Sequence, residues 1–470
     1  MENKGIKRGE KGFLKEKDFF FIESSKDDYN ILFHEPSSRF AKVNKSFDTF
    51  SFSEQELAEH FNYLGVIPHE DKKLEMGIGR IGMTFMSART CNLGCKYCFA
   101  GTGEYGSVEE KPKLYTYENY MKAIKTGIKM YPEGIKSISF FGGEPLLNIK
   151  EIIKFVPDCI QFFENNNLPI PQFAISTNLI AITDEIARFF AYYNINCVIS
   201  LDGPKEINDM ARVPKYGEMS VYDKVVEGCN ILDRNGVSYV VQATINKHHM
   251  DSYVEGYAIK WAKELERINW ENIAVVPVET DLPDLKIQGE NLEKLNLFTR
   301  ELTNYYIQKL YGEDIDKIAS GIIAPILQIA KQKHVNDCSS GHSVFCDTDS
   351  NVYPCQMFCN NDVYKLGNLN EGWSGIKVSE IVNYKRVGTP ECNNCISRNI
   401  CFMWCKGIQL LSKGEIFRVC EPRCVFQKAN TEECIKTLAR LTRGTQEYEC
   451  FWKNYRKVGE YLRRDGFITE

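Results

Sequence analysis

Six short apolar segments, separated by amphipathic ones, constrain the fold more than any other feature of this sequence. The intervening segments, such as 117–131 and 184–194, carry apolar residues at helical spacing. Six strand–helix units in series predict a parallel sheet curled as a full or partial barrel. We expect an α/β partial (β/α)6 barrel of the TIM type over residues 80–285. The six predicted strands are 82–88, 137–141, 172–176, 196–201, 239–245 and 272–278.

The segments outside the barrel predict four further regions. Residues 1–75 hold a basic tail and a small α+β domain. In this domain "DFFFI" and "YNILFH" predict strands, and "SFSEQELAEHFNYLGVI" predicts a helix capped by Ser53. Residues 286–335 predict a helical linker, residues 336–426 a cysteine-rich domain with short elements, and residues 427–470 a helical tail.

Composition and charge exclude several classes of protein. The net charge is -5 over 470 residues, which gives no electrostatic case for nucleic-acid binding. No apolar run reaches the roughly 18 residues that span a bilayer, and the N-terminus lacks the pattern of a signal peptide. We therefore expect a cytoplasmic protein without a membrane segment and without a disulfide framework. The uneven clustering of its 18 cysteines points to metal instead.

The first cysteine cluster directly follows the first predicted barrel strand. Cys91, Cys95 and Cys98 are spaced so that one loop can wrap three thiolates around a single inorganic core, and thiolates are the usual ligands of iron–sulfur clusters. A four-iron cluster held by three cysteines keeps one iron open for a substrate or cofactor. Zinc is the alternative, but a structural zinc site needs four ligands, and no histidine or fourth cysteine is nearby in the sequence.

This pattern, with Tyr97 before the third cysteine, resembles the radical S-adenosylmethionine (SAM) enzymes. The resemblance continues in "FFGGEPLL" (140–147), "STN" (176–178) and "SLDGP" (200–204), which end the second, third and fourth predicted strands. It implies a [4Fe–4S] cluster on the three cysteines, SAM at the open iron, and a 5'-deoxyadenosyl radical that removes hydrogen from a substrate. The residues implied to contact SAM are Tyr97, Gly142, Gly143, Glu144, Pro145, Ser176, Asn178, Ser200, Asp202 and Arg212, the last through the SAM carboxylate.

The second cysteine cluster, "CNNCISRNICFMWC" (392–405), has the spacing C-x2-C-x5-C-x3-C. By itself this spacing predicts a zinc ribbon. Beside a radical SAM barrel it resembles the SPASM extension, which carries two auxiliary [4Fe–4S] clusters. The ligands implied for one cluster are Cys338, Cys346, Cys355 and Cys405, and for the other Cys392, Cys395, Cys401 and Cys420, with Cys424 as the alternative to Cys420 and Cys359 unassigned.

Two positions depart from the SPASM pattern. Ser350 stands where that family usually has glycine, so we expect a slightly different turn there. Gln356 follows Cys355, where the anaerobic sulfatase maturases of this family have an aspartate that serves as a base. A neutral amide cannot accept that proton, which counts against a sulfatase maturase.

SPASM enzymes commonly modify peptides or proteins. The resemblance therefore implies an oxidoreductase that matures a ribosomally made precursor peptide (a RiPP maturase) by forming an intramolecular cross-link, namely a cysteine thioether. The alternatives are a carbon–carbon cross-link and the oxidation of one protein side chain, as in the sulfatase system. A non-catalytic metal-binding scaffold is the alternative outside the enzymes.

The expected partners are a cysteine-containing precursor peptide with its leader and a reductant such as flavodoxin or ferredoxin. Residues 18–75 resemble the winged-helix-like leader-binding domain of such maturases, in which a leader adds as a strand to a sheet edge. A plain hairpin cap on the barrel is the alternative for this segment. Lys42 and Lys45 are candidates to meet an acidic leader, or are solvated.

Overall fold

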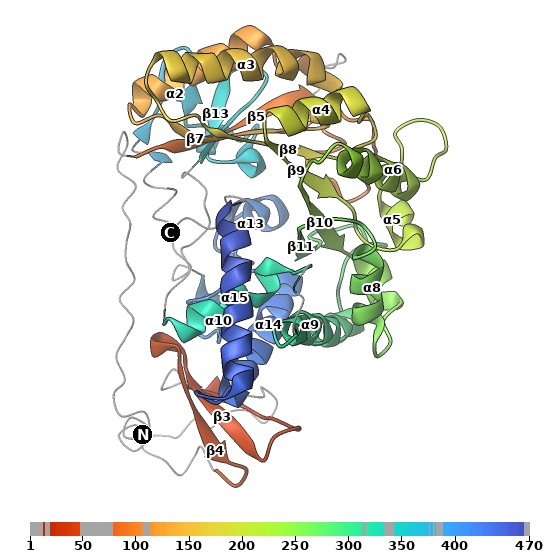
Figure 1. Ribbon diagram of the computed structural model, residues 1–470, viewed down its shortest axis with the longest axis vertical. Coiled ribbons are helices and arrows are strands. Elements are labelled where there is room, and N and C mark those ends of the chain that lie inside the picture. Colours follow the sequence, from red (N-terminus) through yellow and green to blue (C-terminus); the bar gives the residue numbers. More distant parts are fainter. Residues whose placement is uncertain are drawn as a thin grey trace.

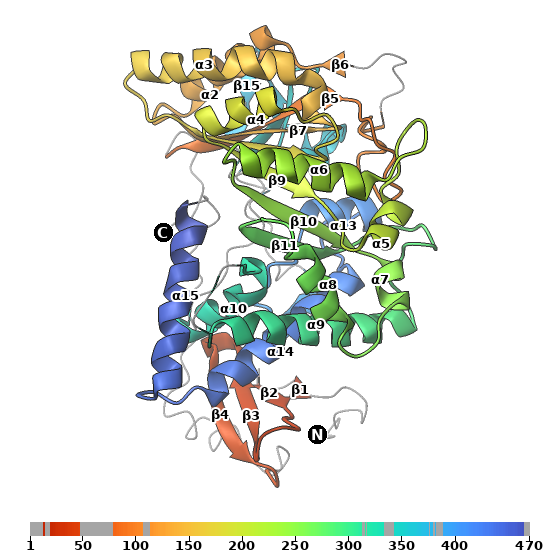
Figure 2. The same ribbon diagram turned by 45° about the vertical axis from the view of Figure 1, so that its right-hand side comes forward.

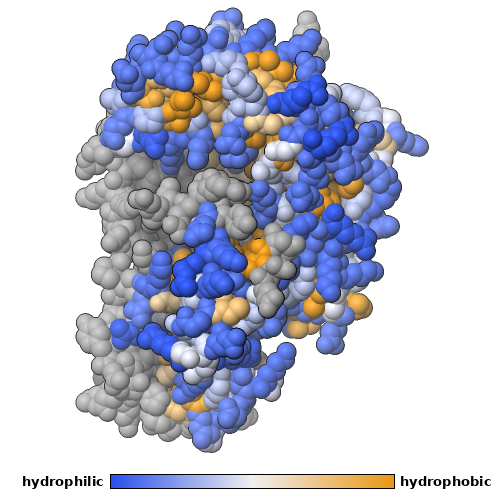
Figure 3. All heavy atoms as spheres, viewed as in Figure 1, coloured by the Kyte–Doolittle hydropathy of each residue, from blue (hydrophilic) through white to orange (hydrophobic). Residues whose placement is uncertain are grey.

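The computed structural model describes residues 13–14, 19–47, 79–106, 113–312, 315, 317–332, 343–375, 377–378, 381 and 389–464. One large sheet runs from the top to the middle of the molecule, and a small sheet of N-terminal residues lies at the opposite end (Figure 1). Long helices lie between the two sheets (Figure 2). In this described part no helix is long and apolar enough to cross a membrane. The face in Figure 3 is mostly hydrophilic, with small, separate hydrophobic areas.

Six parallel strands form the partial barrel. Their order in the sheet follows their order in the chain, and each pairs in parallel with the next. The predicted α/β partial barrel is confirmed, and each predicted strand overlaps an observed one. The strands are β5 (Ile81–Arg89), β7 (Ile135–Gly142), β8 (Gln172–Thr177), β9 (Ile195–Ser200), β10 (Tyr239–Ile245) and β11 (Asn272–Pro277).

Helices follow the barrel strands and return the chain across the sheet, which allows successive strands to run parallel. Three of these helices have an N-cap residue whose side chain accepts a hydrogen bond from the backbone N–H three residues later. The N-cap residues are Thr116, Thr183 and Ser220. The helices are α2 (Tyr117–Met130), α3 (Ile149–Asn165), α4 (Asp184–Tyr192), α5 (Lys205–Ala211), α6 (Val221–Arg234), α7 (Lys247–Asp251) and α8 (Tyr257–Leu265).

The cysteine-rich region continues the barrel sheet, a pairing that the sequence pattern does not predict. β12 (Ser343–Cys346) pairs in parallel with β5, on the edge opposite β7. Arg89 at the end of β5 forms an ion pair with Asp349 at 2.8 Å, just after β12. A four-residue strand is too short to show a periodic pattern, and its pairing depends on the free edge of β5. A further short strand, β6 (Lys113–Leu114), pairs with β5. An antiparallel ribbon follows β12 and consists of β13 (Asn351–Tyr353), β14 (Gly367–Asn368) and β15 (Gly372–Trp373).

The N-terminal sheet is antiparallel and is held against the C-terminal half by two acidic side chains. The Glu35 carboxylate, which is buried, accepts a hydrogen bond from the backbone N–H of Asn399 at 2.9 Å and pairs with Arg398. Asp27 pairs with Arg440 at 2.9 Å. The helix predicted from Ser53 lies outside the described residues. The strands are β1 (Phe13–Leu14), β2 (Phe19–Ile22), β3 (Tyr29–His34) and β4 (Arg39–Asn44), paired in that order.

Helices of the C-terminal half join the two sheets. Arg300 pairs with Glu432 and Glu433 at 2.5 and 2.7 Å, which ties α9 to α14. Asn430 Nδ2 donates to the Ile322 carbonyl at 2.7 Å, which ties α14 to α10. These helices are α9 (Glu290–Lys309), α10 (Ser320–Ala330), α12 (Pro390–Asn393), α13 (Lys406–Lys413), α14 (Glu421–Arg440) and α15 (Gln446–Arg464).

Candidate active site

The loop that carries Cys91, Cys95 and Cys98 leaves the carboxyl end of β5 and is held by the segment after α5. Three backbone hydrogen bonds join the two segments: Gly94 N–H to Val213 O at 2.8 Å, Lys96 N–H to Ala211 O at 2.9 Å, and Lys215 N–H to Asn92 O at 3.0 Å. The three half-buried thiols therefore sit on a fixed loop at the carboxyl ends of the strands, where barrels of this kind carry their reactive groups.

The three thiols are near enough to affect one another. Burial raises the pKa of Cys91 to about 12, and the neighbouring Cys95 and Cys98 add to the increase. Burial also raises the pKa of Cys95 to about 11. Bound iron would reverse this preference, because a metal ion stabilises the thiolates that coordinate it.

The glycine-rich turn after β7 packs against the start of the thiol loop. Gly143 and Glu144 donate their backbone N–H groups to Ala88 O and Thr90 O, at 2.8 and 2.9 Å. A Cβ atom on Gly143 would lie 2.0 Å from Thr90 O, and one on Gly142, which has φ +128°, would lie 2.6 Å from Ala88 O. Only glycine permits this close approach, so the turn and the thiol loop form one rigid unit.

Glu144 joins this unit to the end of β8. Its buried carboxylate accepts hydrogen bonds from the backbone N–H groups of Leu146 and Asn178, at 2.9 and 2.8 Å, and from the Thr177 hydroxyl at 2.7 Å. Burial raises the pKa of Glu144 to about 7 despite these three donors, which act to lower it. Pro145 follows, buried, as the first residue of a short 3-10 helix.

The ends of β8 and β9 contribute the other predicted polar contacts. Asn178 Nδ2 donates to Asn92 Oδ1 at 2.8 Å and lies 3.7 Å from the Cys91 sulfur. Ser176 and Ser200 are half-buried, and they alternate with buried residues that face the helices. Their side chains therefore lie on the barrel's inner face, near the thiol loop.

Asp202 binds the two remaining residues that were predicted to contact SAM, Tyr97 and Arg212. Its fully buried carboxylate accepts hydrogen bonds from the Tyr97 hydroxyl, from Arg212 at 3.0 Å and from the Thr244 backbone N–H at 3.0 Å. Arg212 also lies over the Tyr97 ring, 5.4 Å from its centre. Its Nε–H is buried and has no hydrogen-bond partner within the described residues. Burial alone would lower the pKa of Arg212, but the Asp202 carboxylate raises it above its ordinary value.

These residues fit the cofactors that the sequence implies. Three thiols share one loop, as a cluster with one open iron requires. The orphaned Nε–H of Arg212 provides a buried, charged donor beside that loop, as a carboxylate ligand requires. The turn at Gly142 and Gly143 places backbone without side chains beside the thiol loop.

The second thiol group gathers around α14. Cys424 lies close enough to Cys392, Cys395 and Cys401 for all three to raise its pKa, after burial as the main cause. Cys420 instead lies 3.6 Å from the Ser412 hydroxyl and near Glu279. Cys392, Cys395, Cys401, Cys420 and Cys424 all line one cavity, so both candidates for the fourth ligand lie with the three other thiols.

A third thiol group lies on the inner side of the sheet. Cys355 and Cys359 flank a short 3-10 helix and pack into one apolar cluster with Cys98. Gly407, two residues after Cys405, lies against Met357 of that same helix, where a Cβ atom would approach Met357 Cβ to 2.2 Å. Cys405 lies two residues before this contact, and it also lines the cavity that holds Cys392 and Cys395.

Cys346 lies on the other face of the sheet. It pairs in register with Phe85, so the two side chains share a face. Phe85 packs on Tyr115 and Tyr120, with ring centres 5.4 and 5.2 Å apart, in the helix-covered core. Cys346 is therefore separated by the sheet from Cys355. Cys338, its predicted companion, lies outside the described residues.

A site for a single metal ion needs three or more ligands that converge on one point. Among the described residues, no three cysteine, histidine or acidic side chains converge closely enough to hold a single metal ion.

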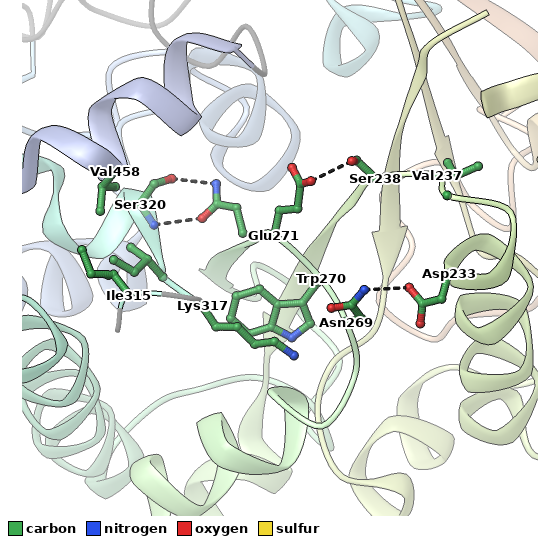
Figure 4. A pocket seen from close by; sticks show the side chains of 13 residues that line it. Asp233, Val237, Ser238, Asn269, Trp270, Glu271, Ile315, Lys317, Ser320 and Val458 are labelled. Atoms are coloured by element: carbon green, nitrogen blue, oxygen red, sulfur yellow. Dashed lines mark hydrogen bonds between the residues drawn. The ribbon is translucent and has the colours of Figure 1, made fainter. Parts of the chain in front are cut away.

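A separate cavity lies at the amino ends of β10 and β11, away from the thiol loop. It has a volume of about 410 Å³. Figure 4 shows Lys317 beside the Trp270 ring, and Ser238 donating to Glu271 at 2.7 Å. Reactive groups of such barrels gather at the carboxyl ends of the strands, so this cavity is not part of the candidate site.

Comparison with known proteins identifies the barrel. Residues 86–258 match the family model described as the Radical SAM superfamily. This match covers the thiol loop, the Gly142–Gly143 turn and Arg212. Residues 86–258 therefore form a radical SAM domain. SAM and a [4Fe–4S] cluster are accordingly its cofactors, as expected from the resemblance.

Characterised relatives are similar over most of the chain. The cysteine-type anaerobic sulfatase-maturating enzyme of Clostridium novyi (strain NT) is 23% identical over 339 residues, 68% of this chain and 86% of the relative. The radical SAM cyclopropyl synthase TigE of Paramaledivibacter caminithermalis is 24% identical over 383 residues, 77% of this chain and 75% of the relative.

A solved structure shows the same fold. The structure of native anSMEcpe with bound AdoMet and Kp18Cys peptide is 18% identical, with a TM-score of 0.61, and the match covers 76% of this chain and 97% of that chain.

Proposed function

We propose that this radical SAM enzyme oxidises a ribosomally made precursor peptide and forms an intramolecular cross-link in it. The observation that carries the proposal is the position of the second and third thiol groups, in a domain that continues the sheet of the barrel itself. Two named relatives support a polypeptide substrate: one is a sulfatase-maturating enzyme, and the solved structure with the same fold contains a bound peptide.

Residues at the ends of the strands are assigned the following roles. Cys91, Cys95 and Cys98 hold the cluster, which together with SAM supplies a 5'-deoxyadenosyl radical that removes a hydrogen atom from the peptide. The free Nε–H of Arg212 binds the SAM carboxylate while its terminal nitrogen stays on Asp202. The residues assigned to the rest of SAM are Tyr97, Gly142, Gly143, Glu144, Pro145, Ser176, Asn178 and Ser200.

Two auxiliary [4Fe–4S] clusters are part of the proposal, with ligands adjusted to the structure. One is held by Cys392, Cys395, Cys401 and Cys424, whose pKa the other three thiols raise; Cys420 lines the same cavity and stays the alternative ligand. The other is held by Cys355, Cys359 and Cys405, with Cys338 as a candidate fourth ligand. Cys359 replaces Cys346 because it shares an apolar cluster with Cys355, whereas Cys346 lies behind the sheet.

A groove beside the N-terminal sheet suits the leader of the peptide. Strand β4 is the edge of this sheet, and the groove between β4 and helices α10, α14 and α15 has a volume of about 940 Å³. An added strand would hydrogen-bond to the edge, and an acidic leader would meet basic side chains. The basic residues that line the groove include Lys42, Lys331, Arg443 and Arg456.

The proposed product is a cysteine thioether. Gln356, which follows Cys355, still counts against oxidation of a single side chain in the sulfatase manner, since an amide is no base. A carbon–carbon link is the second candidate, favoured by the similarity to an enzyme named a cyclopropyl synthase. The proposed electron donor is a flavodoxin or ferredoxin, and the proposed location is the cytoplasm.

A mass spectrum of the peptide tests this function. The anaerobically reconstituted enzyme is incubated with SAM, a reductant and the short cysteine-containing peptide encoded nearest its gene. A loss of two hydrogens per cross-link, with the affected thiols no longer alkylated, supports the thioether. The same loss with every thiol free supports the carbon–carbon link. An unchanged peptide, although SAM is cleaved, contradicts the substrate.

A further inference from the structure

The loop after Cys98 has a backbone that side chains rarely adopt. Five of the six residues from Gly101 to Gly106 have positive φ, and two of these are not glycine: Thr102 at +60° and Tyr105 at +54°. Such a conformation persists only where the surrounding structure holds it, and clusters of it mark functional sites. The loop lies between the first thiol group and the cysteine-rich region.

Contacts from both sides hold this loop in place. A Cβ atom on Gly103 would lie 2.5 Å from Gly143 Cα, so the loop covers the glycine-rich turn. Glu104 forms an ion pair with Lys215 at 2.9 Å. The carbonyl of Tyr105 accepts a hydrogen bond from Asn360 Nδ2, one residue beyond Cys359. The loop therefore joins the segment of Cys98 to the segment of Cys359.

The backbone conformation of this loop places the Tyr105 ring in a buried position. It is 8% exposed and packs between Phe99 and Phe345, with ring centres 5.9 and 6.2 Å away. Cys98, Cys355 and Cys359 are all close enough to interact with its hydroxyl. One aromatic ring is thus adjacent to a thiol of the SAM cluster and to two thiols assigned to an auxiliary cluster.

We propose that Tyr105 is the bridge through which an electron passes between the auxiliary cluster at Cys355 and Cys359 and the cluster at Cys91, Cys95 and Cys98. One electron moves and no atom does: the auxiliary cluster loses it and is oxidised, and the SAM cluster gains it and is reduced. The ring acts as a conducting contact and keeps its proton. This inference rests on the cluster ligands of the proposed function, but not on the peptide.

Substitutions at Tyr105 separate the ring from the hydroxyl. In the full-length reconstituted enzyme, without peptide, one electron per chain is introduced photochemically, and its distribution between the two clusters is followed by freeze-quench electron paramagnetic resonance. Tyr105→Phe keeps the ring and is expected to keep the wild-type rate. Tyr105→Leu removes the ring and is expected to slow the exchange about tenfold or more, at unchanged iron content. Phe99→Leu, which removes a ring on the solvent side of Tyr105, is the matched control and is expected to leave the rate unchanged.

Several outcomes overturn the bridge. They are an unchanged rate in Tyr105→Leu, an equal slowing in Tyr105→Phe, or an equal slowing in the control. If Tyr105→Leu binds less iron, Tyr105→Met is measured in its place, and loss of iron from both assigns Tyr105 to structural support alone. A wild-type enzyme with only one reducible cluster overturns both the bridge and the auxiliary ligands. An unmodified peptide with normal exchange overturns the proposed substrate and leaves the bridge intact.

Discussion

Arg212 and Asp202 form a buried ion pair at 3.0 Å beside the thiol loop, and the Nε–H of Arg212 is buried without a partner in the described structure. One guanidinium can therefore serve two carboxylates, Asp202 and the carboxylate assigned to SAM. Asp202 fixes the side chain, and the free donor binds the ligand.

Replacing this arginine tests the second contact. Lysine has a single charged nitrogen and cannot keep both partners in place. Arg212→Lys is expected to weaken SAM binding by about 10- to 100-fold, because a hydrogen bond to a charged group contributes about 1.5–3 kcal/mol. Isothermal titration of the reconstituted enzyme with SAM measures this. Arg234→Lys, at an exposed pair with Asp184, is the control, and equal affinity in both variants would mean that Arg212 serves only Asp202.

The carboxyl of Glu144 predicts a pH dependence of stability. Its folded pKa of about 7 lies above the ordinary value of 4.5, so the folded state holds a proton that the unfolded state releases. Its contribution to stability is therefore largest below pH 4.5 and falls as the pH rises towards 7, by up to about 3 kcal/mol.

Glu144→Gln removes this titration. It also leaves the Asn178 N–H facing an amide or without an acceptor, which costs about 1–3 kcal/mol. The melting temperature of the variant should fall further below that of the wild-type enzyme at pH 5 than at pH 7.5. Thermal melts of the metal-free proteins at both values measure the difference, and an equal difference at both would rule out Glu144 as the titrating group.

Iron content distinguishes Cys359 from Cys346. Cys359→Ala is expected to lose about four irons per chain, the content of one [4Fe–4S] cluster. Cys346→Ala is expected to keep its iron and to lower the free energy of unfolding by about 1–2 kcal/mol, because it leaves a small cavity in the core. Iron and acid-labile sulfide assays decide between them, and the reverse result would restore Cys346 as a ligand.

The same comparison applies to Cys424 and Cys420. Cys424→Ala should lose the irons of the cluster shared with Cys392, Cys395 and Cys401, since its thiol lies among them. Cys420→Ala should lose only a contact with Ser412. Mössbauer spectra of the two iron-57 proteins measure the number of clusters directly. A full set of clusters in Cys424→Ala would contradict this assignment.

The sequence predicted those parts that depend on local pattern. Strands such as β8 and β10 are apolar runs between helical segments, and a buried parallel strand needs little else. Cys91, Cys95 and Cys98 share one loop, so their spacing alone places them together. The strand that precedes them fixes the end of the barrel at which they lie.

The choice among the candidate auxiliary ligands depends on tertiary contacts. Cys420 and Cys424 are one helical turn apart, and the sequence does not show which of them the packing of α14 turns towards Cys395. The face on which Cys346 lies is set by the register of β12 on β5. Tyr105 could have been noticed, because three glycines within "GTGEYG" indicate an unusual backbone, but its neighbours come from a segment some 250 residues away.

The central claim is that the SAM-derived radical takes hydrogen from a peptide. The most direct test is deuterium transfer: the precursor peptide is prepared with fully deuterated side chains and incubated with the reconstituted enzyme, SAM and a reductant. The account predicts deuterium in the 5'-deoxyadenosine that is formed, in amounts that match the cross-linked peptide. Unlabelled 5'-deoxyadenosine, formed while the peptide stays unchanged, would contradict it.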